Sequence, residues 1–277
     1  MKAQKKKFRR ALNWIKFILT VVLAVSAIAA LFFSPLFDIK HITMTESKHY
    51  SREQILEATS LSAGTNGFVS LIKNAGGITN ALRLLSFRHA LAEDAILNGF
   101  PYVKTAAVRF NPPNAVKIDI TEREAVALVP YMGSNLIVDA DGYVLDINHK
   151  AQAEPLPVIK GLAFEGYKMG QALKLDNPEA FASAKTLMNT IKDADEADKQ
   201  KLWGLVNSID ASSPDATYMN VDSRIMVNLG NITGLSYDSL LYRIRFFKQI
   251  FIKNLKKDDK GLVNFTMGEN PKFIPQH

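Results

Sequence analysis

The chain has 277 residues, a formal net charge of +7 and no cysteine, which excludes a disulfide framework and thiol chemistry. The positive charge does not indicate nucleic-acid binding. The seven cations between Lys2 and Lys16 supply the whole excess, and from residue 17 onward Lys+Arg and Asp+Glu are equal at 27 each.

An uncharged stretch of 21 residues, Phe17 to Phe37, follows the basic segment. A helix of this length rises about 30 Å, which is the thickness of a bilayer's hydrocarbon core. The sequence therefore predicts a transmembrane helix over 17–37. Because cationic flanks stay in the cytoplasm, residues 1–16 are expected to form a cytoplasmic tail and the bulk of the chain to be exported.

Two alternatives compete with an uncleaved anchor. Ala27-Ile28-Ala29 resembles the small-residue cleavage site of a signal peptide, although the apolar run continues past it through Phe33. A buried core helix is the other alternative, but soluble helices rarely run this long without a polar face. The pattern favours the anchor.

The next segment, up to about residue 130, predicts a β-α-α-β-β arrangement. Alternation over 37–44 is typical of a short strand, and Ser51 is a good N-cap for a helix that begins near residue 52. Residues 68–100 predict one or two helices. Strands at 102–110 and 115–120 then flank a proline-containing turn. We expect a three-stranded sheet with two helices on one face.

The remainder is richer in strands. A hairpin is predicted around Asp141-Gly142, since Asp-Gly favours tight hairpin turns. Further strands are expected at 156–159, 203–209, 216–221, 224–229, 262–267 and 272–274, with helices at 176–193 and 236–256. The apolar stripe of the second helix predicts a core face, and its cations are expected largely opposite: Arg243, Arg245, Lys248, Lys253, Lys256 and Lys257. The fold class is α+β.

No catalytic constellation emerges from the sequence. The five histidines are scattered, and none has metal-ligand spacing. Asp139, Asp141 and Asp146 are more typical of a hairpin turn than of a calcium loop. The charges at 122–124 predict a solvated or salt-bridged strand edge. We therefore expect no catalytic residue, cofactor, metal or small-molecule substrate.

One segment resembles a known family. Its residues PYVKTAAVRFNPPNAVKIDITEREAVALV (101–129) resemble the signature of the FtsQ/DivIB cell-division family, and LIVDADGYVLD (136–146) and LPVIKGL (156–162) are similar to its following hairpin and strand. The order of a short cytoplasmic tail, one anchor and two exported domains agrees with that family.

The resemblance implies a POTRA domain at 38–130 and an FtsQ-type β-domain at 131–277. It also implies a non-catalytic divisome scaffold that lies in the cytoplasmic membrane at the septum, recruits FtsB/DivIC-like and FtsL-like single-span proteins and helps control septal peptidoglycan synthesis. In this family a partner adds a strand to the C-terminal edge, which corresponds here to 262–274. The candidate anchors are Phe265, Met267, Phe273 and Ile274.

Two other functions remain open at this stage. A POTRA-bearing secretion or outer-membrane assembly component usually has repeated POTRA units and a barrel, and neither is predicted. A signal-anchored envelope hydrolase requires a pocket with convergent polar groups.

Overall fold

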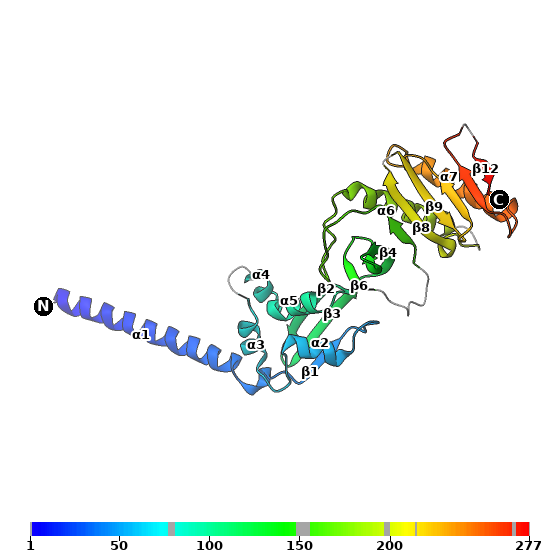
Figure 1. The fold of residues 1–277 in the computed structure, drawn as a ribbon. Helices are drawn as coiled ribbons and strands as arrows, with labels where there is room; N and C mark the ends of the chain where they lie inside the picture. The colour runs from blue at the N-terminus through cyan, green and yellow to red at the C-terminus, as the bar shows by residue number, and fades with distance from the viewer. Residues whose placement is uncertain are drawn as a thin grey trace. The chain divides into compact units, whose positions relative to one another are not determined.

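The computed structural model describes residues 2–76, 81–147, 156–196, 200–213, 215–267 and 270–276. The chain divides into two compact units, residues 1–122 and 123–277 (Figure 1). This division precedes the boundary expected between 130 and 131. The reason is that β4 (Ala125–Tyr131) pairs with β5 (Ser134–Asp139) and so belongs to the sheet of the second unit.

The first unit begins with the long helix α1 (Lys2–Phe32). The stretch Asn13–Phe37 is long and apolar enough to cross a membrane. The expected helix over 17–37 is wrong at its end, because α1 stops at Phe32 and a separate 3-10 turn, η1 (Pro35–Phe37), follows. Pro35 explains the break, since its ring clashes with the preceding turn and disfavours a helical residue before it.

A three-stranded sheet in the order β1-β3-β2 forms the centre of this unit. β1 (His41–Met44) runs parallel to β3 (Ala115–Glu122), and β2 (Val103–Asn111) is antiparallel to β3. The strand expected over 37–44 is shorter, because η1 occupies its first residue. Four described helices replace the expected two: α2 (Arg52–Thr59), α3 (Gly67–Lys73), α4 (Ala81–Leu85) and α5 (Ala90–Gly99).

Alternate residues of the strands bury the core of this unit. Val108, Val116 and Ile118 are fully buried, and Ile55 of α2 and Ile96 of α5 pack with them. The N-cap of α2 is a capping box in which the Ser51 hydroxyl accepts from Gln54 N–H and the Gln54 side chain accepts from Ser51 N–H. The sequence therefore fixes both the start and the buried face of α2.

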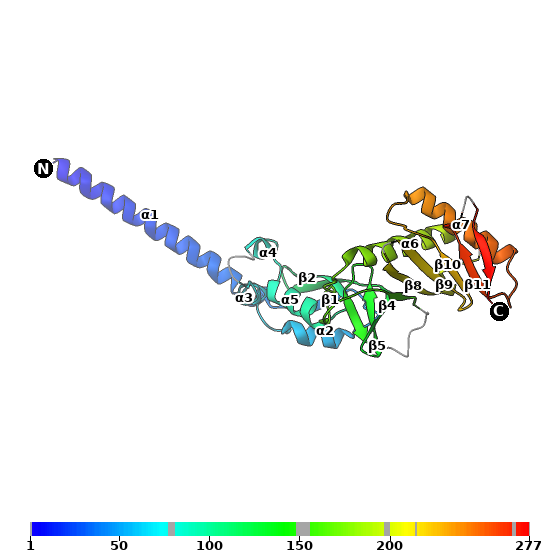
Figure 2. The ribbon, with the colours of Figure 1, turned by 45° about the horizontal axis from the view of Figure 1, so that its top comes forward.

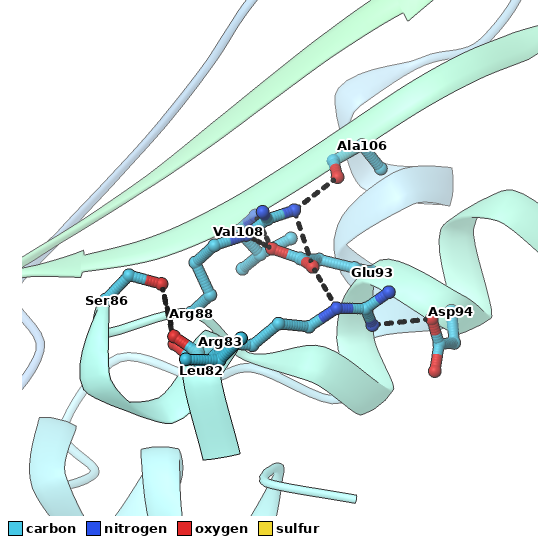
Figure 3. Close-up of polar contacts among 8 residues, drawn as sticks. All are labelled: Leu82, Arg83, Ser86, Arg88, Glu93, Asp94, Ala106 and Val108. Atoms are coloured by element: carbon cyan, nitrogen blue, oxygen red, sulfur yellow. Dashed lines mark hydrogen bonds and ion pairs between the residues drawn. The ribbon is translucent and has the colours of Figure 1, made fainter. Parts of the chain in front are cut away.

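A buried carboxylate ties α5 to β2 (Figure 3). Glu93 accepts two hydrogen bonds from Arg88, at 2.6 and 2.8 Å, and one from the Val108 backbone N–H at 2.9 Å. Arg83 of α4 lies 3.8 Å from Glu93 and donates to Asp94 at 2.9 Å. The two guanidinium groups compensate the buried negative charge, so α4 is held against α5 by ion pairs.

His89, next to this cluster, is fully buried, and neither ring nitrogen has a hydrogen-bond partner among the described residues. Burial lowers the pKa of His89 from 6.5 to about 4, and the nearby Val108 carbonyl opposes this only in part. The folded unit therefore holds the imidazole neutral at physiological pH.

This predicts a pH dependence of stability. The unfolded chain binds a proton at His89 below pH 6.5 and the folded chain does so only near pH 4, so the stabilisation is complete above 6.5 and is lost as pH falls through this window. Between pH 7 and pH 5 we expect the first unit to lose about 2 kcal/mol. Urea unfolding followed by amide exchange of β3 measures this, and the difference between His89→Gln and wild type isolates the contribution of His89. An equal pH slope in both proteins contradicts the prediction.

The second unit is built on nine described strands in the order β12-β11-β10-β9-β8-β7-β4-β5-β6. Those not yet given are β6 (Val144–Ile147), β7 (Val158–Lys160), β8 (Val206–Ser213), β9 (Ala216–Val221), β10 (Ile225–Asn228), β11 (Gly261–Asn264) and β12 (Lys272–Pro275). The segment expected as a strand from 203 begins instead as a 3-10 turn, η3 (Trp203–Leu205). The predicted fold class, α+β with an N-terminal apolar helix and a strand-rich domain, is confirmed.

Two helices, α6 (Pro178–Glu196) and α7 (Tyr237–Lys253), lie together on one side of β8 to β11 (Figure 2). Leu187 and Ile191 of α6 and Ile244 and Phe247 of α7 are buried against the sheet. Spacings of three and four residues produce this face, as predicted for α7. The opposite side of these strands is not covered by either helix.

The expectation that Lys248 lies on the solvent face of α7 is wrong. Lys248 is 3% exposed, and its Nζ lies 2.5 Å from Asp195 Oδ1 at the end of α6. Asp195 also accepts the backbone N–H groups of Leu202 and Trp203, at 2.9 and 2.8 Å. A buried charge pair therefore joins the two helices to η3.

Arg123 and Asp139 form a second buried pair in this unit, 2.7 Å apart. The Arg123 guanidinium stacks over the Tyr143 ring, and Asp139 accepts the N–H groups of Asp141 and Tyr143. The predicted hairpin turn is thus confirmed. The neighbouring Glu122 is held in the first unit by Ser47 and the Lys48 and His49 N–H groups, which lower its pKa although burial acts to raise it. The salt-bridged interpretation of residues 122–124 is confirmed for Arg123, and Glu122 is held by hydrogen bonds instead.

Candidate partner-binding edge

β12 lies at one edge of the nine-stranded sheet, and its inner side pairs antiparallel with β11. Gln276 N–H donates to Lys260 O at 2.9 Å, which fixes the phase of the ladder. Because hydrogen-bonded and non-hydrogen-bonded pairs alternate, the main-chain groups of Lys272 and Ile274 face β11 and those of Phe273 and Pro275 face outward. The outer side of β12 is thus a free strand edge.

Two prolines restrict this edge. Pro275 occupies an outward-facing position. Pro271, directly before the strand, is four residues earlier and so falls in the same outward-facing set of alternate positions. Neither proline has an N–H group. The outward face of β12 therefore offers one donor, the Phe273 N–H, and the carbonyls of Phe273 and Pro275. Prolines at these positions lose no hydrogen bond to β11 and limit uncontrolled pairing with other chains. Sequence reasoning overlooked both, although the pattern P-K-F-I-P carries the signal.

The side chains of the edge divide between two faces. Phe273 is opposite Val263 and packs against the helix-covered core, whereas Ile274 is opposite Leu262 and lies on the uncovered face. Leu262 is in turn opposite Met226 of β10, so Ile274, Leu262 and Met226 form a row across three strands. Ile274 and Met226 are both exposed, so the uncovered face presents an apolar row beside the free edge.

The four predicted anchors differ in their accessibility. Phe265 follows β11 and is only 8% exposed, because it belongs to the core and its N–H donates to Asn228 O at 2.9 Å. Phe273 is half-buried on the core side. Met267 is 48% and Ile274 41% exposed. The structure therefore brings Phe273 and Ile274 together on β12 but on opposite faces, and residues 268 and 269 within this segment lie outside the described residues.

A depression of about 500 Å³ lies on the uncovered face next to the apolar row. Its lining includes Met226, Leu262, Asn220 and the charged residues Lys160, Asp210 and Lys260. The Asn220 Oδ1 atom is buried there without a hydrogen-bond partner among the described residues. A ligand that crosses this face thus meets apolar contacts and charges of both signs.

No metal-binding group of three or more His, Cys, Asp or Glu residues occurs within the described parts of the chain. Of the five histidines, His149 and His277 lie outside those parts. The chemistry of the edge is that of main-chain pairing and apolar contact.

Gly261 allows β12 to approach β11 closely. A Cβ atom at this position would lie 2.4 Å from Ile274 O and 2.8 Å from the Phe273 ring, closer than such atoms can approach. We expect Gly261→Ala to displace β12 and to lower the free energy of unfolding by about 1–3 kcal/mol. Amide exchange at Gln276 is expected to accelerate. Gly234→Ala is the matched control, since nothing lies within 4 Å of its Cβ, and equal effects of the two variants contradict the close-approach explanation.

Comparisons with known proteins support the resemblance. Residues 69–123 match the model of the POTRA domain, FtsQ-type. The cell division protein DivIB of Clostridium acetobutylicum is 22% identical over 242 residues, which cover 87% of this chain and 84% of that protein. The chain is thus similar to the FtsQ/DivIB family, through an FtsQ-type POTRA domain and full-length DivIB relatives. DivIB of Enterococcus faecalis V583 is 23% identical over 269 residues, and the chain spans 60% of its length.

A solved structure, the major extracytoplasmic domain of DivIB from Geobacillus stearothermophilus, matches at 15% identity and a TM-score of 0.29. The match covers 49% of this chain and 99% of that one. The family-model match and the DivIB relatives support a division-related protein with a POTRA domain. The one long apolar helix among the described residues, near the N-terminus, fits a single-pass membrane protein.

Proposed function

We propose that this chain is a membrane-anchored scaffold of the bacterial cell-division machinery. Residues 1–16 form its cytoplasmic tail, α1 crosses the membrane, the POTRA domain follows, and the strand-rich unit recruits a partner outside the cytoplasm. The free outer side of β12 carries this proposal, because a free strand edge bound by an added strand is a recurring mode of peptide recognition.

The partners proposed are FtsB/DivIC-like and FtsL-like single-span proteins at the septum. One partner segment adds as a strand beside β12, where it exchanges hydrogen bonds with the Phe273 and Pro275 main chain. Ile274 and Met226 then supply apolar contact on the uncovered face. Anchors in a common membrane raise the effective concentration of such partners, so a short strand suffices for capture.

The proposed mode of action is binding without catalysis, through which the chain helps to control septal peptidoglycan synthesis. Its similarity to cell-division proteins favours this over a secretion component or an envelope hydrolase. The expected effect is on the assembly and timing of the enzymes that synthesise septal peptidoglycan.

The test combines localisation and co-purification. A fluorescent fusion of the full chain is expected at midcell in dividing cells, and its depletion is expected to produce filaments. The two single-span partners are expected to co-purify with it from solubilised membranes. A uniform envelope distribution together with normal division on depletion would overturn the scaffold proposal.

A further inference from the structure

Beyond α1 and η1, the described part of the first unit exposes its large apolar side chains within one stretch of the sequence. Among the described residues 38–122, every large apolar side chain classed as exposed falls between positions 72 and 91: Ile72, Leu82, Leu85, Phe87 and Leu91. Leu82 is 82% exposed and Leu85 78%. These five side chains lie within 20 positions of the sequence, whereas exposed apolar residues elsewhere are usually scattered singly, so this stretch is a candidate interaction site.

The two leucines of α4 are directed outward by the fold. They are three residues apart and so lie on one face of the helix, whereas Leu84 packs toward the core. Arg83 holds α4 in place through its ion pair with Asp94 (Figure 3). Because this pair anchors the helix, the exposure of Leu82 and Leu85 is a property of the folded unit.

Ring contacts connect Phe87, just after α4, to the end of α1. The Phe87 ring lies 6.0 Å from that of Phe68, which lies 4.6 Å from that of Phe32, the last residue of α1. Asn66 reinforces the junction, since its Nδ2 donates to the carbonyls of Phe32 and Ser34, both at 3.1 Å. Phe87 is therefore two ring contacts away from Phe32, the last residue of α1.

We propose that α4 and its flanking residues seat in the interfacial layer of the same bilayer that α1 crosses. Leu82, Leu85 and Phe87 enter the boundary between headgroups and acyl chains, and the exposed Lys73 reaches the lipid phosphates. The ion pairs of Arg83 neutralise its charge beneath this face. This inference rests on membrane insertion of α1 and goes beyond partner recruitment, because it assigns a lipid-binding surface to the POTRA unit.

The absence of cysteine makes the test direct. The single variants Leu82→Cys, Leu85→Cys, Leu23→Cys and Glu57→Cys of the full chain are each purified and labelled with an environment-sensitive fluorophore. Each is then placed in nanodiscs of phosphatidylcholine and phosphatidylglycerol. The emission maxima of the probes at 82 and 85 are expected to shift to the blue relative to that of the free fluorophore in water. Lipids brominated near the headgroup are expected to quench both probes. Glu57 is exposed on α2, and a probe there is expected to remain in water.

The probe at Leu23, within the span, separates the two ways of failing. Deep quenching at 23 with water-like emission at 82 and 85 overturns this inference and leaves the anchor intact. No quenching at 23 overturns the anchor itself. If the probes at 82 and 85 become shielded only when a division partner is added to the nanodisc, the surface binds protein and the lipid assignment is wrong.

Discussion

Ile274→Glu is expected to weaken capture of the partner strand at least about tenfold, which is a loss of about 1.4 kcal/mol or more of binding free energy. The side chain is 41% exposed on the uncovered face of the edge strand, so the substitution leaves the core untouched. A glutamate there places a charge in the apolar row with Leu262 and Met226, which the bound partner would have to desolvate. Binding of the purified partner ectodomain to the full chain in nanodiscs measures the change.

Met132→Glu is the matched control, because Met132 is 87% exposed and lies in the turn between β4 and β5. The same gain of charge at this position is expected to leave partner binding unchanged. Equal weakening by both variants, or none by Ile274→Glu, would exclude the edge as the capture site. Glutamate at Phe265 is a poor test, since this side chain is buried and its substitution perturbs the fold.

Lys248→Met is expected to destabilise the second unit by about 3–5 kcal/mol, because it leaves the Asp195 carboxylate buried without its cation. The loss is larger than that expected for an exposed lysine, whose ion pairs contribute little. Urea unfolding followed by Trp203 fluorescence measures it, since Trp203 N–H donates to Asp195. Replacing Trp14 by Phe removes the other tryptophan signal.

Lys253→Met on the same helix serves as the control, because Lys253 is exposed. It is expected to change the unfolding free energy by less than about 0.5 kcal/mol. Lys248→Met combined with Asp195→Asn is expected to recover part of the loss, since the amide removes the uncompensated charge and still accepts a backbone hydrogen bond. A double variant as unstable as Lys248→Met alone would show that the ion pair is not the cause.

Local sequence signals predicted the elements better than the connections between them. The capping box at Ser51, the Asp-Gly turn at Gly142 and the apolar stripe of α7 each depend on neighbours within a few residues, and the structure reproduces them. The burial of Lys248 is not predictable from such local signals, because it depends on a residue far away in the sequence. Its partner Asp195 is 53 positions away, and nothing local distinguishes this lysine from the solvated ones beside it.

The candidate site was predicted in part. Its place at the C-terminal edge came from resemblance, whereas the partition of Phe273 and Ile274 between two faces depends on register with β11. The end of α1 also depended on a specific residue, because the apolar run continues to Phe37 while Pro35 breaks the helix. Hydropathy alone does not report such a break.

The prolines around β12 have a consequence for inhibitor design. The edge offers one amide donor and two carbonyl acceptors, so a competing peptide requires very few of its own amides for pairing. Its remaining amides face away and can be N-methylated without loss of a bond to the protein. Such methylation would stop the peptides from stacking on one another and would protect them from proteases. A short, alternately N-methylated strand mimic is therefore a rational starting point for blocking this edge.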